Sequence, residues 1–74
     1  MDTHNPELRM ISRAQLETLL GLSRSTIYDR LSRKSKRYDP TFPQPIKLGR
    51  LSRWRLSEVL DWIESKAVLR NQSV

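Results

Sequence analysis

GLSRSTIYDRL, the stretch at residues 21–31, predicts a tight turn followed by a capped helix. Gly21 can adopt the left-handed backbone conformation that ends a helix, because it has no Cβ to clash. Leu22 is then free to fill the corner between two helices, and Ser23 is a good N-cap for the second one. The stretch therefore predicts a helix-turn-helix, with its second helix over residues 24–33.

The residues before this turn predict a first helix. Ser12 is a good N-cap, and Gln15 three residues later completes the pattern of a capping box. Residues 10–11 form a short apolar lead into it. The helix is expected over residues 13–20, with an apolar stripe formed by Leu16, Leu19 and Leu20.

The chain after the second helix predicts a loop and then a hairpin. Prolines at positions 40, 43 and 45 break the helical pattern in and beside residues 34–44. Apolar residues then alternate over residues 46–54 on both sides of Gly49-Arg50, which is typical of a short hairpin with a type II′-like turn. Such a hairpin is marginal alone and must pack against helices.

A third helix is expected over residues 58–69, with Ser57 as its N-cap. Its buried face is predicted to consist of Val59, Leu60, Trp62 and Ile63. The fold class is therefore α+β and mostly helical, a small winged helix-turn-helix with three helices and a short β-hairpin wing. The expected organisation is a flexible N-terminal arm at residues 1–9, a winged-helix domain at residues 10–69 and a frayed C-terminal tail at residues 70–74.

The composition indicates a nucleic-acid partner rather than an enzyme. The 74 residues carry a formal net charge of +6, and ten of the 14 basic residues are arginine, whose planar fork suits phosphate and guanine. The absence of cysteine excludes disulfides and cysteine-based zinc sites, and the single histidine, His4, lies in the predicted arm. The carboxylates form no acid–base dyad or metal-ligand pattern, and two glycines make no phosphate loop. No catalytic residue, metal or cofactor is expected.

Nothing in the sequence predicts a membrane partner. No apolar run approaches the ~20 residues that span a bilayer, and nothing resembles a signal peptide. The expected location is the cytoplasm, at the nucleoid when the protein is bound to DNA.

The second helix is predicted to have two different faces. Ile27 and Leu31 fall four residues apart on the buried side, with Tyr28 beside them and its hydroxyl at the rim. The opposite face collects Ser25, Thr26, Asp29, Ser32 and Arg33. Small hydroxyl groups and the unpaired N–H groups of a helix start suit a major groove, where Arg24 could bind guanine. A plain solvated face fits the same residues equally well.

Basic residues beside this helix favour the DNA interpretation. Four follow the helix, at positions 33, 34, 36 and 37, and four lie on or next to the hairpin. Asp29 fits a groove only if it pairs with Arg33 or accepts from a cytosine amine. The residues expected to contact DNA are Ser23, Arg24, Ser25, Thr26, Tyr28, Asp29, Arg33, Lys47, Arg50, Arg53 and Arg55.

The chain resembles the AlpA-type prophage regulators, relatives of the phage excisionases with a MerR-like winged helix. Three motifs carry the resemblance: GLSRSTIYDRL at residues 21–31, FPQPIKLG at residues 42–49 and RWRLSEVLDWI at residues 53–63. It implies that residues 23–26 and Tyr28 open the recognition helix and that residues 42–49 lead into the wing. It also implies that Arg50 lies at the wing tip and that Trp54 leads back to the last helix.

One segment departs from the family pattern. SRKSKRYDPT, at residues 32–41, is longer and more basic than the connection expected between the recognition helix and the wing. This departure leaves open where the helix ends and how the wing is angled against it.

The resemblance implies a small DNA-binding activator of an integrase gene or a directionality factor for prophage excision. The expected partner is double-stranded DNA at a promoter or attachment site, with the second helix in the major groove and the basic wing on the backbone or minor groove. Integrase, RNA polymerase and cooperating copies of the chain itself are further candidate partners.

Two alternatives use other partners. A protein-binding module on the same scaffold could inhibit a regulator or contact a recombinase, and it would need exposed apolar anchors. Trp54 and Trp62 are the candidate anchors, although their positions on a strand end and a helix stripe favour the core. RNA binding is disfavoured because the sequence offers few aromatic residues for base stacking.

Overall fold

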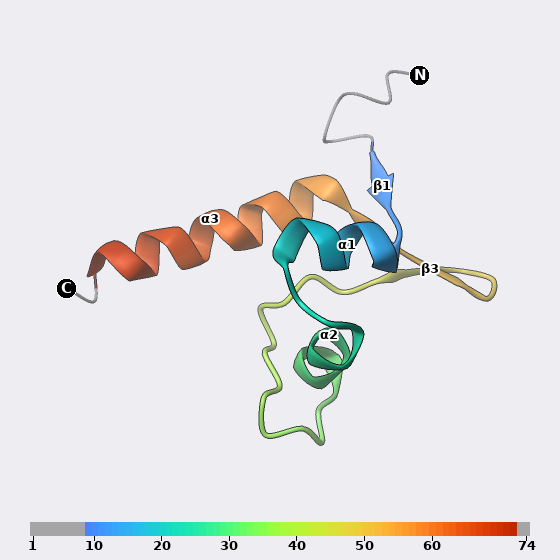
Figure 1. The fold of residues 1–74 in the computed structure, drawn as a ribbon, viewed down its shortest axis with the longest axis horizontal. Coiled ribbons are helices and arrows are strands. Elements are labelled where there is room, and N and C mark those ends of the chain that lie inside the picture. Colours follow the sequence, from blue (N-terminus) through green and yellow to red (C-terminus); the bar gives the residue numbers. More distant parts are fainter. Residues whose placement is uncertain (1–8, 73–74) are drawn as a thin grey trace.

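The computed structural model describes residues 9–72 of the chain (Figure 1). Residues 1–8 of the predicted arm, with His4, and residues 73–74 of the predicted tail lie outside the described residues. In chain order the elements are β1 (Met10–Ile11), α1 (Arg13–Leu20), α2 (Arg24–Leu31), β2 (Ile46–Leu48), β3 (Leu51–Arg55) and α3 (Leu56–Gln72). This arrangement confirms the predicted α+β fold class with three helices and a hairpin wing. None of these helices is both long and apolar enough to cross a bilayer.

The first helix and the turn form as predicted. Ser12 Oγ accepts from the Gln15 N–H at 3.2 Å, and Gln15 Oε1 accepts from the Ser12 N–H at 2.9 Å, which closes both halves of the capping box. Gly21 ends α1 in the left-handed region, with φ 66° and ψ 27°. Ser23 then caps α2 by accepting from the Thr26 N–H at 3.2 Å.

Helix α2 ends at Leu31, two residues before its predicted end. In a longer helix, the carbonyl of Arg30 would accept from the N–H four residues later. Instead it accepts from the Asp39 N–H at 2.9 Å, and Ser32 is extended, with φ −87° and ψ 119°. Arg33 was predicted on the helix face, and it lies in the connection that follows.

The sheet has one strand more than predicted. β2 and β3 pair in an antiparallel register that leaves Gly49 and Arg50 as a two-residue link. Gly49, the first residue of the link, has φ 66°, whereas the φ of Arg50, the second, is not positive. This combination is the pattern of a type II′ turn. β1 pairs with the other edge of β3, with Ile11 opposite Trp54, so the strand order is β1-β3-β2. A two-residue strand is too short for its periodicity to show in the sequence.

Helix α3 begins at Leu56, directly after β3, and not behind a Ser57 cap. The Leu56 N–H donates to the carbonyl of Arg9 at 3.0 Å, so the backbone beside β1 satisfies a donor at the helix start. The other end lies at Gln72, beyond the predicted end at residue 69. The helix projects well past the rest of the molecule (Figure 1).

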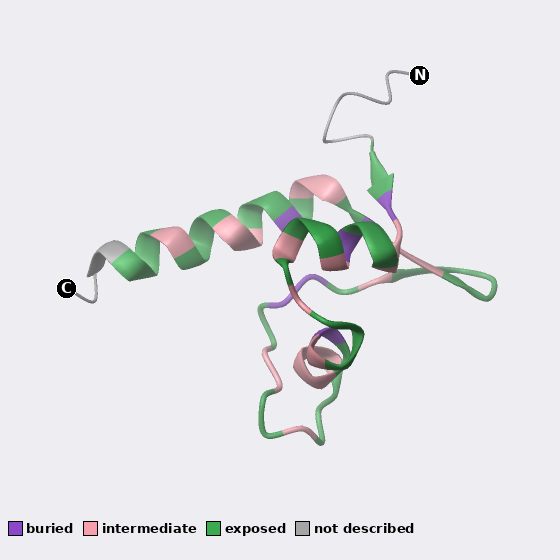
Figure 2. Ribbon diagram, viewed as in Figure 1, coloured by how far each residue is buried: buried purple, intermediate pink, exposed green. Residues whose placement is uncertain are grey.

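The core lies where α1, α2, β3 and the start of α3 meet (Figure 2). Its buried hydrophobic side chains are Ile11, Leu16, Ile27, Phe42, Trp54 and Val59. Leu19 and Leu60 were predicted to be buried, yet they are 44% and 39% exposed, because only one narrow side of each helix meets the small body. Tyr28 was expected beside the core and is 43% exposed. Trp62 is half-buried, and its ring packs edge-on against Phe42 with 5.0 Å between centroids.

The basic connection between α2 and β2 is attached to the rest of the fold. The Trp54 indole N–H donates to the carbonyl of Pro43 at 3.1 Å. Asp39 Oδ1 accepts from the N–H and the hydroxyl of Thr41 at 2.9 and 2.6 Å. Asp39 Oδ2 lies 3.4 Å from Lys66 Nζ. These contacts connect the long segment to β3 and α3.

Candidate nucleic-acid interface

The exposed side of α2 begins with a cluster of hydroxyl groups. Ser23 Oγ lies 2.9 Å from Thr26 Oγ1 and 3.4 Å from Ser25 Oγ. The first N–H groups of a helix have no partner within the helix, so the cluster lies at a point that attracts anions. Hydroxyl and N–H groups of this kind bind phosphate oxygens or base edges. The structure therefore places these three predicted residues together.

Arg24 and Tyr28 form a stacked pair one turn apart on α2. The Arg24 guanidinium carbon lies 5.6 Å from the centroid of the Tyr28 ring, within the range of a cation–π contact. Both residues are exposed. Tyr28 thus belongs to the polar side of the helix and not to the core.

The wing carries the other predicted cations. Lys47 Nζ donates across the hairpin to Ser52 Oγ at 2.7 Å, and Arg53 Nη1 donates to the Ser52 carbonyl at 2.9 Å. Arg50 is exposed in the two-residue turn. Arg55 is the last residue of β3, at the end of the strand far from the turn.

A hollow of about 410 Å³ lies between the start of α1, helix α2 and the wing. Tyr28 and four arginines line it: Arg13, Arg24, Arg50 and Arg53. No acidic residue is among its lining residues. Guanidinium groups bind anions such as phosphate, and often through two parallel hydrogen bonds. Within residues 9–72, no three side chains of the types that bind metal ions come together.

Arg13 is a residue of this hollow that the sequence did not single out. Its Nε donates to Glu17 Oε2 at 3.0 Å. The pKa of the Arg13 guanidinium is raised, first by this hydrogen bond and then by the Tyr28 hydroxyl. Arg13 and Tyr28 lie on different helices and meet only through the packing of α1 on α2, so no spacing in the sequence signals the contact.

The remaining predicted residues lie outside the hollow: Ser23, Ser25, Thr26, Asp29, Arg33, Lys47 and Arg55. Asp29 does not form an ion pair with Arg33, because Arg33 lies beyond the end of α2. Its Oδ2 lies 3.9 Å from Nη1 of Arg37 in the connection. Both side chains are exposed, and an ion pair of this kind contributes little to stability.

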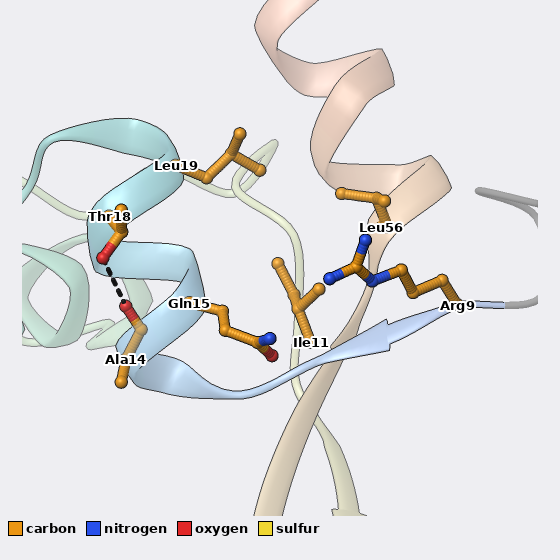
Figure 3. Close-up of a pocket in the computed structure, with 7 residues that line it drawn as sticks. All are labelled: Arg9, Ile11, Ala14, Gln15, Thr18, Leu19 and Leu56. Carbon is orange, nitrogen blue, oxygen red and sulfur yellow. Dashed lines mark hydrogen bonds between the residues drawn. The ribbon is translucent and has the colours of Figure 1, made fainter. Parts of the chain in front are cut away.

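A second hollow of about 450 Å³ lies between β1, α1 and the start of α3 (Figure 3). Ile11, Leu19 and Leu56 give it a mostly apolar lining, and the side chain of Arg9 lies beside Leu56. The two hollows therefore differ in chemistry, since one is basic and adjoins the wing, whereas the other is apolar and adjoins β1.

The helix-turn-helix and its basic hairpin define a small winged helix-turn-helix protein. Over residues 9–67 the chain matches the family model described as prophage CP4-57 regulatory protein (AlpA). It is also 44% identical over 50 residues to the DNA-binding transcriptional activator AlpA of Escherichia coli (strain K12), a match that covers 66% of this chain and 71% of that protein. The chain belongs to the AlpA family of prophage regulatory proteins, which confirms the resemblance found in the sequence. No solved structure matches it.

Proposed function

We propose that the chain binds double-stranded DNA sequence-specifically and regulates transcription in a prophage. The observation that carries this proposal is the hollow in which arginines of α1, α2 and the wing meet beside the hydroxyl cluster of α2. The family of prophage regulators and the relative named as a DNA-binding transcriptional activator support it.

In the proposed complex, α2 enters the major groove with its N-terminal turn facing the bases. Ser25 and Thr26 are small enough for close approach, and Arg24 is long enough to reach guanine. The wing then follows the backbone or the adjacent minor groove through Lys47, Arg50 and Arg53. Because Arg24 of α2 and Arg50 and Arg53 of the wing line one hollow, one duplex would contact both elements without rearrangement.

The proposed targets are the promoter of an integrase gene or a prophage attachment site. At a promoter the chain would recruit RNA polymerase, and at an attachment site it would shape the DNA so that integrase excises the prophage. A module of this size makes few base contacts, so copies of the chain binding side by side would add specificity.

The test is binding to genomic fragments that flank the chain's own gene, measured by gel shift and then by fluorescence anisotropy. The parent should prefer one fragment over unrelated duplexes of equal length. In the double variant Arg24→Ala and Ser25→Ala, we expect that preference to fall by about 1–3 kcal/mol, the value of a bidentate base contact. The melting temperature should change little, because both side chains are exposed.

Arg70→Gln is the matched control, since it removes the same charge at the far end of α3. This variant should keep the parent's preference. A double variant that selects the fragment as well as the parent would contradict the assignment of α2 as the recognition helix. A parent that binds no fragment would contradict the proposed function itself.

Protein binding remains a second candidate function. The tryptophans do not supply its exposed anchors, because Trp54 is buried and Trp62 packs against Phe42. The apolar hollow beside β1 is the observation that favours it (Figure 3). The double variant of α2 separates the two functions, since it changes the proposed DNA face and leaves that hollow intact.

A further inference from the structure

The basic hollow beside the wing gathers four arginines, of which Arg13 is paired with Glu17 outside the lining. Arg13 comes from α1, Arg24 from α2, and Arg50 and Arg53 from the hairpin. Like charges brought together in this way repel one another, and a bound anion would relieve that repulsion. The hollow is therefore arranged for an anionic ligand.

The arginine on α1 is held in place before any ligand arrives. The bond from its Nε to Glu17 Oε2 fixes one edge of the Arg13 guanidinium. Tyr28 lines the same hollow, and its hydroxyl helps to raise the pKa of Arg13. On the facing wall, Arg53 is tied to the Ser52 carbonyl by a hydrogen bond of 2.9 Å. Side chains that are already ordered lose less entropy when they bind.

Two hydroxyl groups of the hollow have protons to donate. Ser12 Oγ already accepts from the Gln15 N–H, and Ser52 Oγ already accepts from Lys47 Nζ. Each oxygen therefore has one of its two lone pairs occupied within the protein, and its O–H can rotate to donate to a ligand. The charged oxygens of a phosphodiester can accept hydrogen bonds from cations and O–H groups on both walls of the hollow. The edge of a guanine would use only one of the hollow's arginines.

We propose that this hollow clamps a single backbone phosphate of DNA between Arg13 of α1 and Arg53 of the wing. The inference rests on the proposed function and adds a sequence-independent contact to it. The clamp would fix the angle between the wing and α2 on the duplex, since its two sides belong to different elements. Arg13 thereby joins the DNA-contacting residues from a helix that was not expected to contribute any.

The experiment measures the affinity for a duplex of arbitrary sequence as the salt concentration rises. Each neutralised phosphate contributes about 0.9 to the slope of log K against log[salt]. Arg13→Gln and Arg53→Gln should each make the slope shallower by up to about 0.9, with similar losses on every sequence. If both arginines hold the same phosphate, the double variant should lose about 0.9 in total and not the sum of two phosphates.

Arg70→Gln is the matched control, because it removes the same charge at the far end of α3, away from the hollow. It should keep the parent's slope. A double variant that loses about 1.8 would overturn the shared clamp, as would an Arg13→Gln variant with the parent's slope. An Arg13→Gln variant that loses affinity only for the preferred fragment would show base reading and would also overturn the proposal. If Arg13→Gln does not fold, two other variants decide the question. Arg13→Lys keeps the charge and should have the parent's slope. Arg53→Gln should have a shallower slope.

Failure of the clamp is distinguishable from failure of the proposed function. A parent that binds the duplex with a steep salt slope, together with unchanged variants, leaves DNA binding intact and removes only the clamp. A parent that does not bind the duplex overturns both.

Discussion

The carboxylate of Asp39 holds the basic connection against the body of the protein. It accepts two hydrogen bonds from Thr41 and lies 3.4 Å from Lys66 Nζ on α3. The pKa of Asp39 is lowered from its ordinary value of 3.8, chiefly by the Thr41 hydroxyl, while burial opposes the shift. Only 15% of this side chain is exposed, so the ionised form depends on these partners.

This shift predicts a pH dependence of stability that belongs to one residue. Because the pKa is lower in the folded state, ionised Asp39 stabilises the fold above its unfolded pKa, and that stability is lost as the pH falls through the folded value. Asp39→Asn should therefore lower the melting temperature at pH 7, and its difference from the parent should shrink below about pH 4. Thermal unfolding from pH 7 down to pH 3 tests this.

Thr41→Val is the companion variant, because it removes the hydroxyl that lies 2.6 Å from the carboxylate. It should reduce the pH dependence without abolishing it, since the N–H of residue 41 still donates. A difference between Asp39→Asn and the parent that is the same at pH 3 and pH 7 would contradict this account.

At the scale of single residues, the sequence predicts local roles better than partners. Ser12, Gly21 and Ser23 were identified as caps because capping depends on neighbours within three or four positions. The roles of Arg13 and Tyr28 depend on how two helices pack, and no local pattern reports that angle. Which residues contact DNA stays a prediction that the binding experiments must test.

At the scale of elements, the turn between α1 and α2 depends on a single glycine. Gly21 has φ 66°, and a Cβ placed there would have no atom within 4 Å. Gly21→Ala should therefore cost about 1–2 kcal/mol through backbone strain alone, without any clash. Gly21→Asn should cost less, because asparagine tolerates the left-handed region better than alanine does.

Urea unfolding of the two variants beside the parent measures these costs. A Cβ at this position meets open space, so a stability ranking of parent, Gly21→Asn and then Gly21→Ala reflects the backbone strain and not a clash. If Gly21→Ala were as stable as the parent, the turn would not require the left-handed conformation, and the angle between the two helices would have another cause.

The sequence predicted most elements correctly and placed their ends less well. Repeating patterns set the positions of α1, the hairpin and the middle of α3. Long-range backbone hydrogen bonds displaced two helix boundaries from their predicted positions. The bond from the Asp39 N–H to the Arg30 carbonyl accompanies the early end of α2, and the bond from the Leu56 N–H to the Arg9 carbonyl accompanies the early start of α3. Strand β1 exists only because β3 offers an unpaired edge. None of these three outcomes has a local signal.

At the scale of the whole molecule, cations and carboxylates are distributed unevenly over the elements. The start of α2, the connection and the wing carry most of the cations, whereas the exposed acidic residues Glu58, Asp61 and Glu64 lie on α3. Helix α3 projects away from the hairpin (Figure 1). A duplex lying across α2 and the wing would therefore meet cations on several elements without meeting the acidic helix.

This distribution predicts how binding responds to salt. If the wing, α2 and the connection together neutralise about six phosphates, the slope of log K against log[salt] should be roughly −5. Arg50→Ala, at the exposed wing tip, should weaken binding to all sequences about equally and make the slope shallower by about 0.9. Arg70→Gln removes the same charge from the far end of α3 and should leave the slope unchanged. Anisotropy titrations across a range of salt concentrations decide the matter, because equal slopes for both variants would mean that net charge, and not the placement of the wing, drives association.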